Sequence, residues 1–281
     1  MKTPAEMSLS DRQTPNGLRI AWAESAAETP GSPLVLLHGY SDSWFSFSRL
    51  LDRLSPGRRA IAVDLRGHGR SDRPETGYSM PDLAQDVARL LTALELTDIT
   101  LVGHSMGSLV AQHVAAECAE RVARLVLIGS TATIRSSDVE ELRLALESIE
   151  GPVPEDFIRE FQLSTLSRPV PGTFLDRVCA ESARVPIHVW RSALAGMFAY
   201  RSAPILGQVL QPTLLIWGQD DAYFTRSDQQ DLLDALPARL VELPGVGHAP
   251  HWEVPSVVAS ELERFERAAH LSVLGSRLSG S

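Results

Sequence analysis

The chain has 281 residues, of which 44% are hydrophobic and 22% are charged, and its formal net charge is −9 at pH 7. The composition is typical of a globular protein, and the length indicates one domain with an insertion. The lack of a basic cluster argues against nucleic-acid binding. A single lysine, Lys2, excludes a Walker phosphate loop and an interior Schiff-base lysine, and two distant cysteines, Cys118 and Cys179, exclude a disulfide scaffold or a cysteine-based zinc site.

The first segment of the chain, residues 1–15, is polar and lacks the apolar core of a signal peptide. No apolar run along the sequence approaches the length of a membrane span. We therefore expect a cytoplasmic protein without a membrane span. Residues 17–25 alternate between polar and apolar side chains, which predicts an antiparallel strand at the edge of a sheet.

Five short apolar runs follow, each bounded by polar or turn residues. They are continuously apolar, as is typical of strands that are covered on both faces of a parallel sheet. Helix-like segments fall between them, and the repeated order of strand and helix predicts an α/β fold with right-handed crossovers. The strands are predicted at 33–37, 60–63, 99–102, 124–128 and 213–217, and the helices at 81–96, 106–119 and 227–236.

The interval 131–206 contains no convincing strand. Ser137 to Glu140 has the form of a capping box, and the apolar residues after it recur at helical spacing. Further helices are predicted to begin at Pro154, at Pro171 or Gly172, and at Pro186. We therefore predict a core domain formed by 1–130 and 207–269, an inserted helical cap at 131–206 and a loose C-terminal tail at 270–281.

The predicted cap is rich in large apolar side chains. Most of them would form the core of the cap itself, and others would line a pocket between the cap and the sheet domain. We predict a pocket lined by Trp44 of the sheet domain and by Phe157, Phe161, Trp190, Met197 and Phe198 of the cap. Such a pocket favours an apolar, medium-chain or aromatic substrate.

The stretch 101–115 places Ser105 between Gly103 and Gly107, where a predicted strand turns into a predicted helix. A serine hydroxyl becomes a useful nucleophile when a base takes its proton during attack. The glycines leave room for a sharp turn that exposes the serine, and the N-terminus of the following helix favours developing negative charge. The pattern predicts a nucleophile elbow with Ser105 at its tip.

Further motifs stand along the chain in a fixed order. They are HGY at 38–40, DLRGHGRSD at 64–72, GHSMG at 103–107, WGQDD at 217–221 and GHAPHWEVP at 247–255. With these motifs in this order, the chain resembles the α/β-hydrolase fold family over nearly its whole length. The resemblance implies a mostly parallel, eight-stranded sheet with helices on both faces and a helical cap inserted after the strand that follows the elbow helix.

The resemblance also implies the partners of Ser105. The family places its base in a loop after the last strand, directly after a glycine, which favours His248; His251, three residues later, is the alternative. The family acid is usually the last residue of G-x-x-D, which favours Asp221 over Asp220. The family oxyanion hole would use the backbone N–H groups of Met106 and Tyr40.

A serine with a histidine base suits acyl transfer to water. We therefore expect a serine hydrolase of the carboxylesterase type, which cleaves small-molecule esters through an acyl-enzyme on Ser105 and needs no cofactor or metal. A serine elbow argues against the dehalogenase and epoxide hydrolase branches, which use aspartate. Three alternatives stay open: a lactonase, a hydrolase of carbon–carbon bonds in meta-cleavage products, whose substrate carboxylate Arg191 could bind, and a non-catalytic small-molecule receptor.

Overall fold

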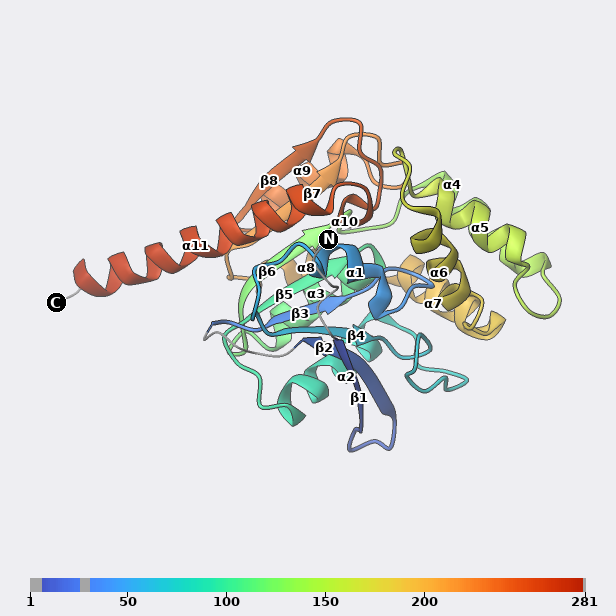
Figure 1. Cartoon of the computed structure of the whole chain (residues 1–281), viewed down its shortest axis with the longest axis horizontal. Helices are drawn as coiled ribbons and strands as arrows, with labels where there is room; N and C mark the ends of the chain where they lie inside the picture. The colour runs from blue at the N-terminus through green and yellow to red at the C-terminus, as the bar shows by residue number, and fades with distance from the viewer. Residues whose placement is uncertain (1–6, 26–30, 280–281) are drawn as a thin grey trace.

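The computed structural model describes residues 7–25 and 31–279 and contains an eight-stranded sheet (Figure 1). The strands lie in the order β1-β2-β4-β3-β5-β6-β7-β8, with β1, β2 and β4 antiparallel and all later pairs parallel. Their bounds are β1 (Met7–Gln13), β2 (Arg19–Ser25), β3 (Leu34–Leu37), β4 (Ala60–Asp64), β5 (Ile99–His104), β6 (Val122–Ile128), β7 (Thr213–Gly218) and β8 (Ala238–Leu243). The predicted α/β fold with a mostly parallel sheet is confirmed.

The parallel strands form where the sequence is continuously apolar. Every residue of β3, β4, β5 and β7 is buried, because helices cover both faces of the sheet. The prediction that 17–25 forms an edge strand is wrong in one respect, since β1 pairs outside β2 and takes the edge. Most residues of β1 are exposed, so its sequence carries little apolar signal, and backbone pairing to β2 accounts for the strand.

Successive strand residues point to opposite faces and build two separate cores. On one face, Val35 and Leu37 pack with residues of α2 (Met80–Ala93), α3 (Met106–Glu117) and α9 (Arg226–Ala235). On the other face, Leu34 and Leu36 pack with residues of α1 (Ser48–Leu51) and α11 (Pro255–Ser279). Two short elements lie near the second face, the 3₁₀ helix η1 (Trp44–Phe47) and α10 (Pro250–Glu253).

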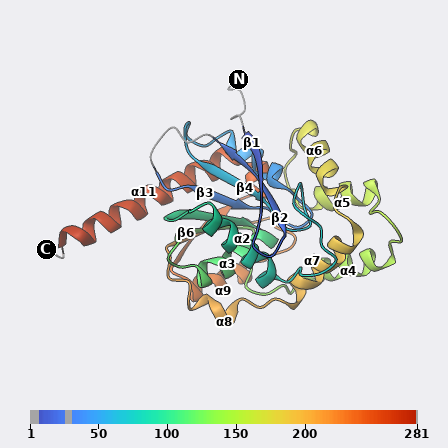
Figure 2. The same ribbon diagram turned by 90° about the horizontal axis from the view of Figure 1, so that it is seen from below.

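Five helices lie between β6 and β7. They are α4 (Ser137–Ser148), α5 (Glu155–Ser164), α6 (Gly172–Ser182), α7 (Ile187–Ala199) and α8 (Ala203–Leu206). The first four gather beyond one end of the sheet, while α8 packs against α3 (Figures 1 and 2). The insertion is closed at its base by a bridge between Thr133 and Arg201 and by a 3.0 Å hydrogen bond from Ser202 N to Ala132 O. The domain boundaries at 131 and 206 stay predictions.

Prolines precede three of these helices in the way the sequence indicates. Pro154, Pro171 and Pro186 are the N-cap residues of α5, α6 and α7. The capping box predicted from Ser137 is not formed at that position, because the N-cap residue of α4 is Ser136, whose side chain makes no capping hydrogen bond.

Helix α11 continues through Ser279, so residues 270–279, expected to form a loose tail, are helical. The helix extends away from the sheet (Figure 1), and its sequence offers no proline to stop it. The remainder of the predicted tail, 280–281, and the first residues of the predicted core domain, 1–6, lie outside the described residues, as do 26–30. Among the described helices, none combines the length and the apolar character needed to cross a membrane.

Candidate active site

Ser105 lies on a strained turn between β5 and α3. Its φ is +49° and its ψ is −118°, a conformation that costs a non-glycine residue free energy and is characteristic of a nucleophile elbow. A Cβ added to Gly103 would lie 2.3 Å from Gly107 O, and one added to Gly107 would lie 2.2 Å from Leu37 O. Both glycines are therefore required by the close approach of backbone atoms around the turn.

Asp221 and His248 form a hydrogen-bonded pair in loops that follow β7 and β8. His248 Nδ1 donates to Asp221 Oδ2 over 2.9 Å, and the Asp221 side chain is fully buried. The other oxygen, Asp221 Oδ1, accepts from the backbone N–H groups of Tyr223 at 2.8 Å and Phe224 at 3.1 Å. These bonds fix the carboxylate. Because Nδ1 of His248 donates to Asp221, Nε2 is the ring nitrogen left to accept a proton. Asp220, the alternative acid, is exposed.

The structure separates the two candidate bases. His248 lines the same pocket as Ser105. His251 lies in α10, fully buried, with Nε2 3.1 Å from Ser46 Oγ, and it is not part of the pocket wall. Burial lowers the pKa of His251 and of His104, whose Nε2 donates to His248 O over 3.1 Å. Burial therefore favours the neutral form of both rings.

The two backbone groups expected to form an oxyanion hole follow neighbouring strands. Leu37 of β3 pairs with Gly103 of β5, so Tyr40 and Met106 each lie three residues beyond a paired position. Within the described part of the chain, the N–H groups of Tyr40 and Met106 have no acceptor. The Tyr40 hydroxyl donates to Trp190 O in the cap over 2.6 Å, which ties this loop to α7.

The pocket above Ser105 lies between the core and the cap and encloses about 480 Å³, part of it open to solvent. Its cap side is mostly apolar, with Val139 and Leu142 of α4, Phe161 of α5, and Leu194 and Met197 of α7, and it also includes the polar Gln162 and Thr165. No arginine or lysine of the described chain lines it. The arrangement therefore accommodates an uncharged, apolar group next to the serine.

Of the pocket residues predicted from the sequence, the structure places Phe161 and Met197 in the wall and four elsewhere. Trp190 is fully buried behind the wall, with its ring centroid 5.1 Å from that of Tyr40, and Phe157 packs on Trp190 at 6.5 Å. Phe198 follows Met197 on α7, and adjacent helical residues point about 100° apart, so it turns away. Trp44 lines a separate surface pocket with Phe45 and Phe174.

The pocket also contains a carboxyl group that the sequence did not single out. Asp42 is buried, and it accepts hydrogen bonds from Ser46 Oγ at 3.2 Å and from Gln162 Nε2 of α5 at 3.3 Å. Loss of hydration raises the pKa of Asp42 to about 7, although these hydrogen bonds and the nearby His248 favour the charged form. Its position in HGYSD, four residues after His38, was the available signal.

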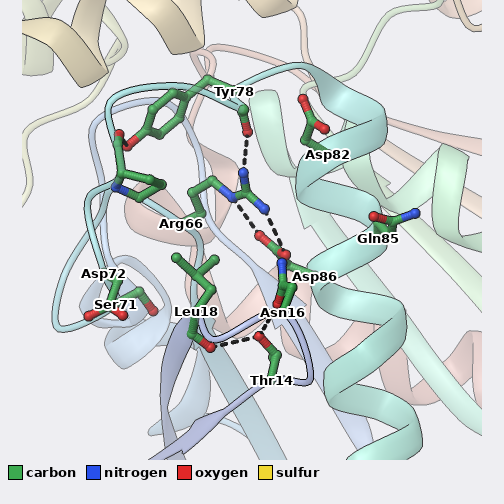
Figure 3. Close-up of polar contacts among 12 residues, drawn as sticks. Thr14, Asn16, Leu18, Arg66, Ser71, Asp72, Tyr78, Asp82, Gln85 and Asp86 are labelled. Carbon is green, nitrogen blue, oxygen red and sulfur yellow. Dashed lines mark hydrogen bonds and ion pairs between the residues drawn. The ribbon is translucent and has the colours of Figure 1, made fainter.

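Asp64 and Arg66 brace loops around the site. Asp64 accepts from the backbone N–H of Trp44 at 2.8 Å and of Arg70 at 2.9 Å. Arg66 forms a two-pronged ion pair with Asp86 of α2, at 2.6 and 2.8 Å, and donates to Gly77 O (Figure 3). The ion pair joins the loop after β4 to α2.

Arg191, the residue that could bind a substrate carboxylate, instead binds backbone carbonyl groups within the cap. Its guanidinium donates to Leu146 O, Glu147 O and Ile149 O at the C-terminal end of α4. A cation at this end of a helix satisfies carbonyl groups that lack partners within the helix. Arg191 is absent from the wall of the pocket.

Comparisons with known proteins agree with this architecture. A model of the alpha/beta hydrolase family matches residues 34–261. A 2-(acetamidomethylene)succinate hydrolase from Mesorhizobium japonicum is 28% identical over 85% of this chain and 89% of its own length, and a non-heme haloperoxidase from Rhodococcus erythropolis is 31% identical over 78% and 86%. The solved structure of an esterase from a Rhodococcus species superposes with a TM-score of 0.81 at 28% identity, over 92% of this chain and 98% of that one. The chain therefore belongs to the alpha/beta hydrolase family.

Proposed function

We propose that this protein is a serine hydrolase that cleaves uncharged, apolar carboxylic esters. Ser105 is the nucleophile, His248 the base, and Asp221 the acid that orients it. The observation that carries the proposal is the 2.9 Å bond between Asp221 Oδ2 and Nδ1 of His248, whose ring lines the same pocket as Ser105 on its strained turn. The ring nitrogen opposite this bond is the one that can take a proton from a serine.

The reaction follows from these positions. Ser105 Oγ attacks the ester carbonyl while His248 Nε2 accepts its proton, and the N–H groups of Tyr40 and Met106 donate to the oxyanion. His248 then protonates the leaving alcohol. A water molecule, deprotonated by the same ring, attacks the acyl-enzyme and releases the acid.

The substrate class rests on the wall of the pocket. The apolar side chains of α4, α5 and α7 favour an apolar acyl or alcohol group, and the Asp42 carboxyl disfavours an anionic one. A hydrolase of meta-cleavage products needs a cation for the substrate carboxylate, and the candidate for that task, Arg191, binds the end of α4 instead. Esters therefore rank above carbon–carbon substrates. A cytoplasmic location remains a prediction from the sequence.

The test is a panel of p-nitrophenyl esters from acetate to decanoate, with a lactone and a dienoic carbon–carbon substrate alongside. We expect ester hydrolysis to be fastest, and covalent labelling by a fluorophosphonate probe to map to Ser105 by mass spectrometry. Labelling of another residue would contradict the nucleophile. Negligible turnover combined with a large rise in thermal stability on ligand binding would point to the receptor alternative.

A further inference from the structure

The loop between α5 and α6 of the cap, residues 165–171, lies directly against the loop that carries His248, residues 244–249. We refer to them as the cap loop and the base loop. The backbone N–H of His248 donates to Thr165 O over 2.8 Å. A Cβ added to Gly247 would lie 2.8 Å from both Thr165 O and Ser167 N. The two loops therefore meet backbone to backbone, with no space between them for a side chain at position 247.

Glu253 of α10 joins the same two loops through one carboxylate. Its Oε1 accepts from Gly247 N over 2.9 Å, and its Oε2 accepts from Arg168 N over 2.9 Å. The residue is 9% exposed, and burial raises the pKa of its carboxyl. One oxygen thus accepts a hydrogen bond from the residue directly before His248, and the other accepts one from the cap loop.

Arg168 of the cap loop binds the opposite end of the base loop. Its Nε donates to Gly245 O over 2.6 Å, and its Nη2 donates to Pro244 O over 2.8 Å. Gly245 has a φ of +63°, which favours glycine at this position. The planar guanidinium suits this arrangement, because its donors have fixed relative directions. Arg168 and Glu253 together fix the base loop at both of its ends.

The same part of the cap contacts the acid loop and the pocket. Ser164 Oγ, at the end of α5, lies 2.6 Å from the Tyr223 hydroxyl, and the Tyr223 N–H donates to Asp221. Phe161 and Thr165 line the pocket. The C-terminal end of α5 is thus both a wall of the pocket and a support for the loops that carry Asp221 and His248.

We propose that Arg168 and Glu253 are positioning residues that hold His248 at its working distance from Ser105, so that the cap loop is part of the catalytic framework. The proposal rests on the proposed function. Neither residue lines the pocket, so their effect must pass through the base loop. Misplacement of a reacting group by 1 Å can cost about 10²-fold in rate.

The test compares four variants with a matched control. Glu253→Gln keeps the shape of the side chain but has one accepting oxygen, so either Gly247 or Arg168 loses its partner. Glu253→Ala removes both acceptors. Arg168→Ala removes both guanidinium bonds, whereas Arg168→Lys can still reach one carbonyl. The control is Arg159→Ala, on α5 of the same cap, whose exposed guanidinium pairs with Asp176 and touches neither loop.

With p-nitrophenyl esters, we expect Glu253→Gln and Arg168→Ala to lower kcat by about 10-fold or more, within the range that small misplacements produce. KM should stay within about twofold, because the wall of the pocket is unchanged. Arg168→Lys should recover part of the kcat lost in Arg168→Ala, and Arg159→Ala should match the wild type. Variants that lose only thermal stability, with kcat unchanged, would overturn the proposal.

A second readout needs no substrate. The proton on His248 Nδ1, shared with Asp221, should give a downfield NMR resonance that Arg159→Ala preserves. We expect Glu253→Gln and Arg168→Ala to shift or broaden it, and an unchanged resonance in both would contradict the positioning role. If the wild type hydrolyses no ester, the proposed function fails, while this resonance still tests whether the cap loop positions His248.

Discussion

Asp221 and His248 lie 27 positions apart in the chain and are joined by a 2.9 Å hydrogen bond beyond the carboxyl ends of β7 and β8. The bond leaves one ring nitrogen of His248 as a base, in a pocket shared with Ser105. Because His248 donates from Nδ1 to Asp221, its Nε2 is the nitrogen that can accept the proton of Ser105.

Ser105→Ala should remove ester hydrolysis while leaving the fold intact. By comparison with other serine triads, kcat should fall about 10⁵- to 10⁶-fold. The alanine keeps a Cβ on the same strained turn, so the melting temperature should change little. The measurement is steady-state hydrolysis of the best p-nitrophenyl ester, with circular dichroism as the check on folding. A variant that keeps most of its activity would show that another residue is the nucleophile.

Asp221→Asn should be far more damaging than Asp220→Asn. An amide at 221 disturbs the tautomer and orientation of His248, which in a comparable triad lowers kcat about 10⁴-fold. Asp220 is exposed, so its amide variant should behave as the wild type. The two substitutions make the same chemical change at adjacent positions. Measuring kcat/KM for both variants therefore shows which carboxylate orients His248. Equal losses would show that Asp221 is not the unique acid.

Asp42 should make stability depend on pH. Burial raises its pKa to about 7 from an ordinary value near 3.8, so the folded protein retains a proton that the unfolded chain loses. The stabilisation from this group is complete below about pH 4 and is lost as the pH rises through 7. Asp42→Asn carries no charge at any pH. The unfolding free energy of this variant, relative to that of the wild type, should therefore rise by about 1–3 kcal/mol from pH 5 to pH 8.

Urea denaturation of both proteins at the two pH values gives this difference. Asp64, whose pKa burial raises to about 6, titrates in both proteins, so its contribution cancels. Asp220→Asn is the control, since its carboxyl is exposed. A constant difference between Asp42→Asn and the wild type would contradict the raised pKa.

The buried ion pair between Arg66 and Asp86 should matter for stability more than for chemistry. Asp86→Ala leaves the largely buried Arg66 guanidinium without a carboxylate partner and should cost about 3–5 kcal/mol in unfolding free energy. Arg66→Ala should cost less, because Asp86 keeps its 3.3 Å contact with Arg89. Replacing both, as Arg66→Met with Asp86→Leu, should cost less than Asp86→Ala alone. A double-mutant cycle by denaturant unfolding measures the coupling, and additive losses would show that the pair does not interact.

Much of the fold was predictable because its signals are local. The continuous apolar runs that became β3 to β7 report burial on two faces, and Pro154, Pro171 and Pro186 mark helix starts through their own backbone restrictions. The elbow at Ser105 is likewise encoded within five residues, since the close contacts at Gly103 and Gly107 exclude any side chain.

The identities of Asp221 and His248 followed from a family resemblance, and their pairing depends on how β7 and β8 are placed side by side. The pocket wall escaped prediction for a related reason. Trp190 and Met197 lie on the same face of α7 but about 10 Å apart along its axis, so the placement of the helix over the core put one behind the wall and the other in it. The residues around Asp42, and the contacts from the cap loop to the base loop, join segments about 80 to 120 positions apart. Local sequence patterns report whether a side chain is buried, but which distant group it meets is set by the packing of whole elements.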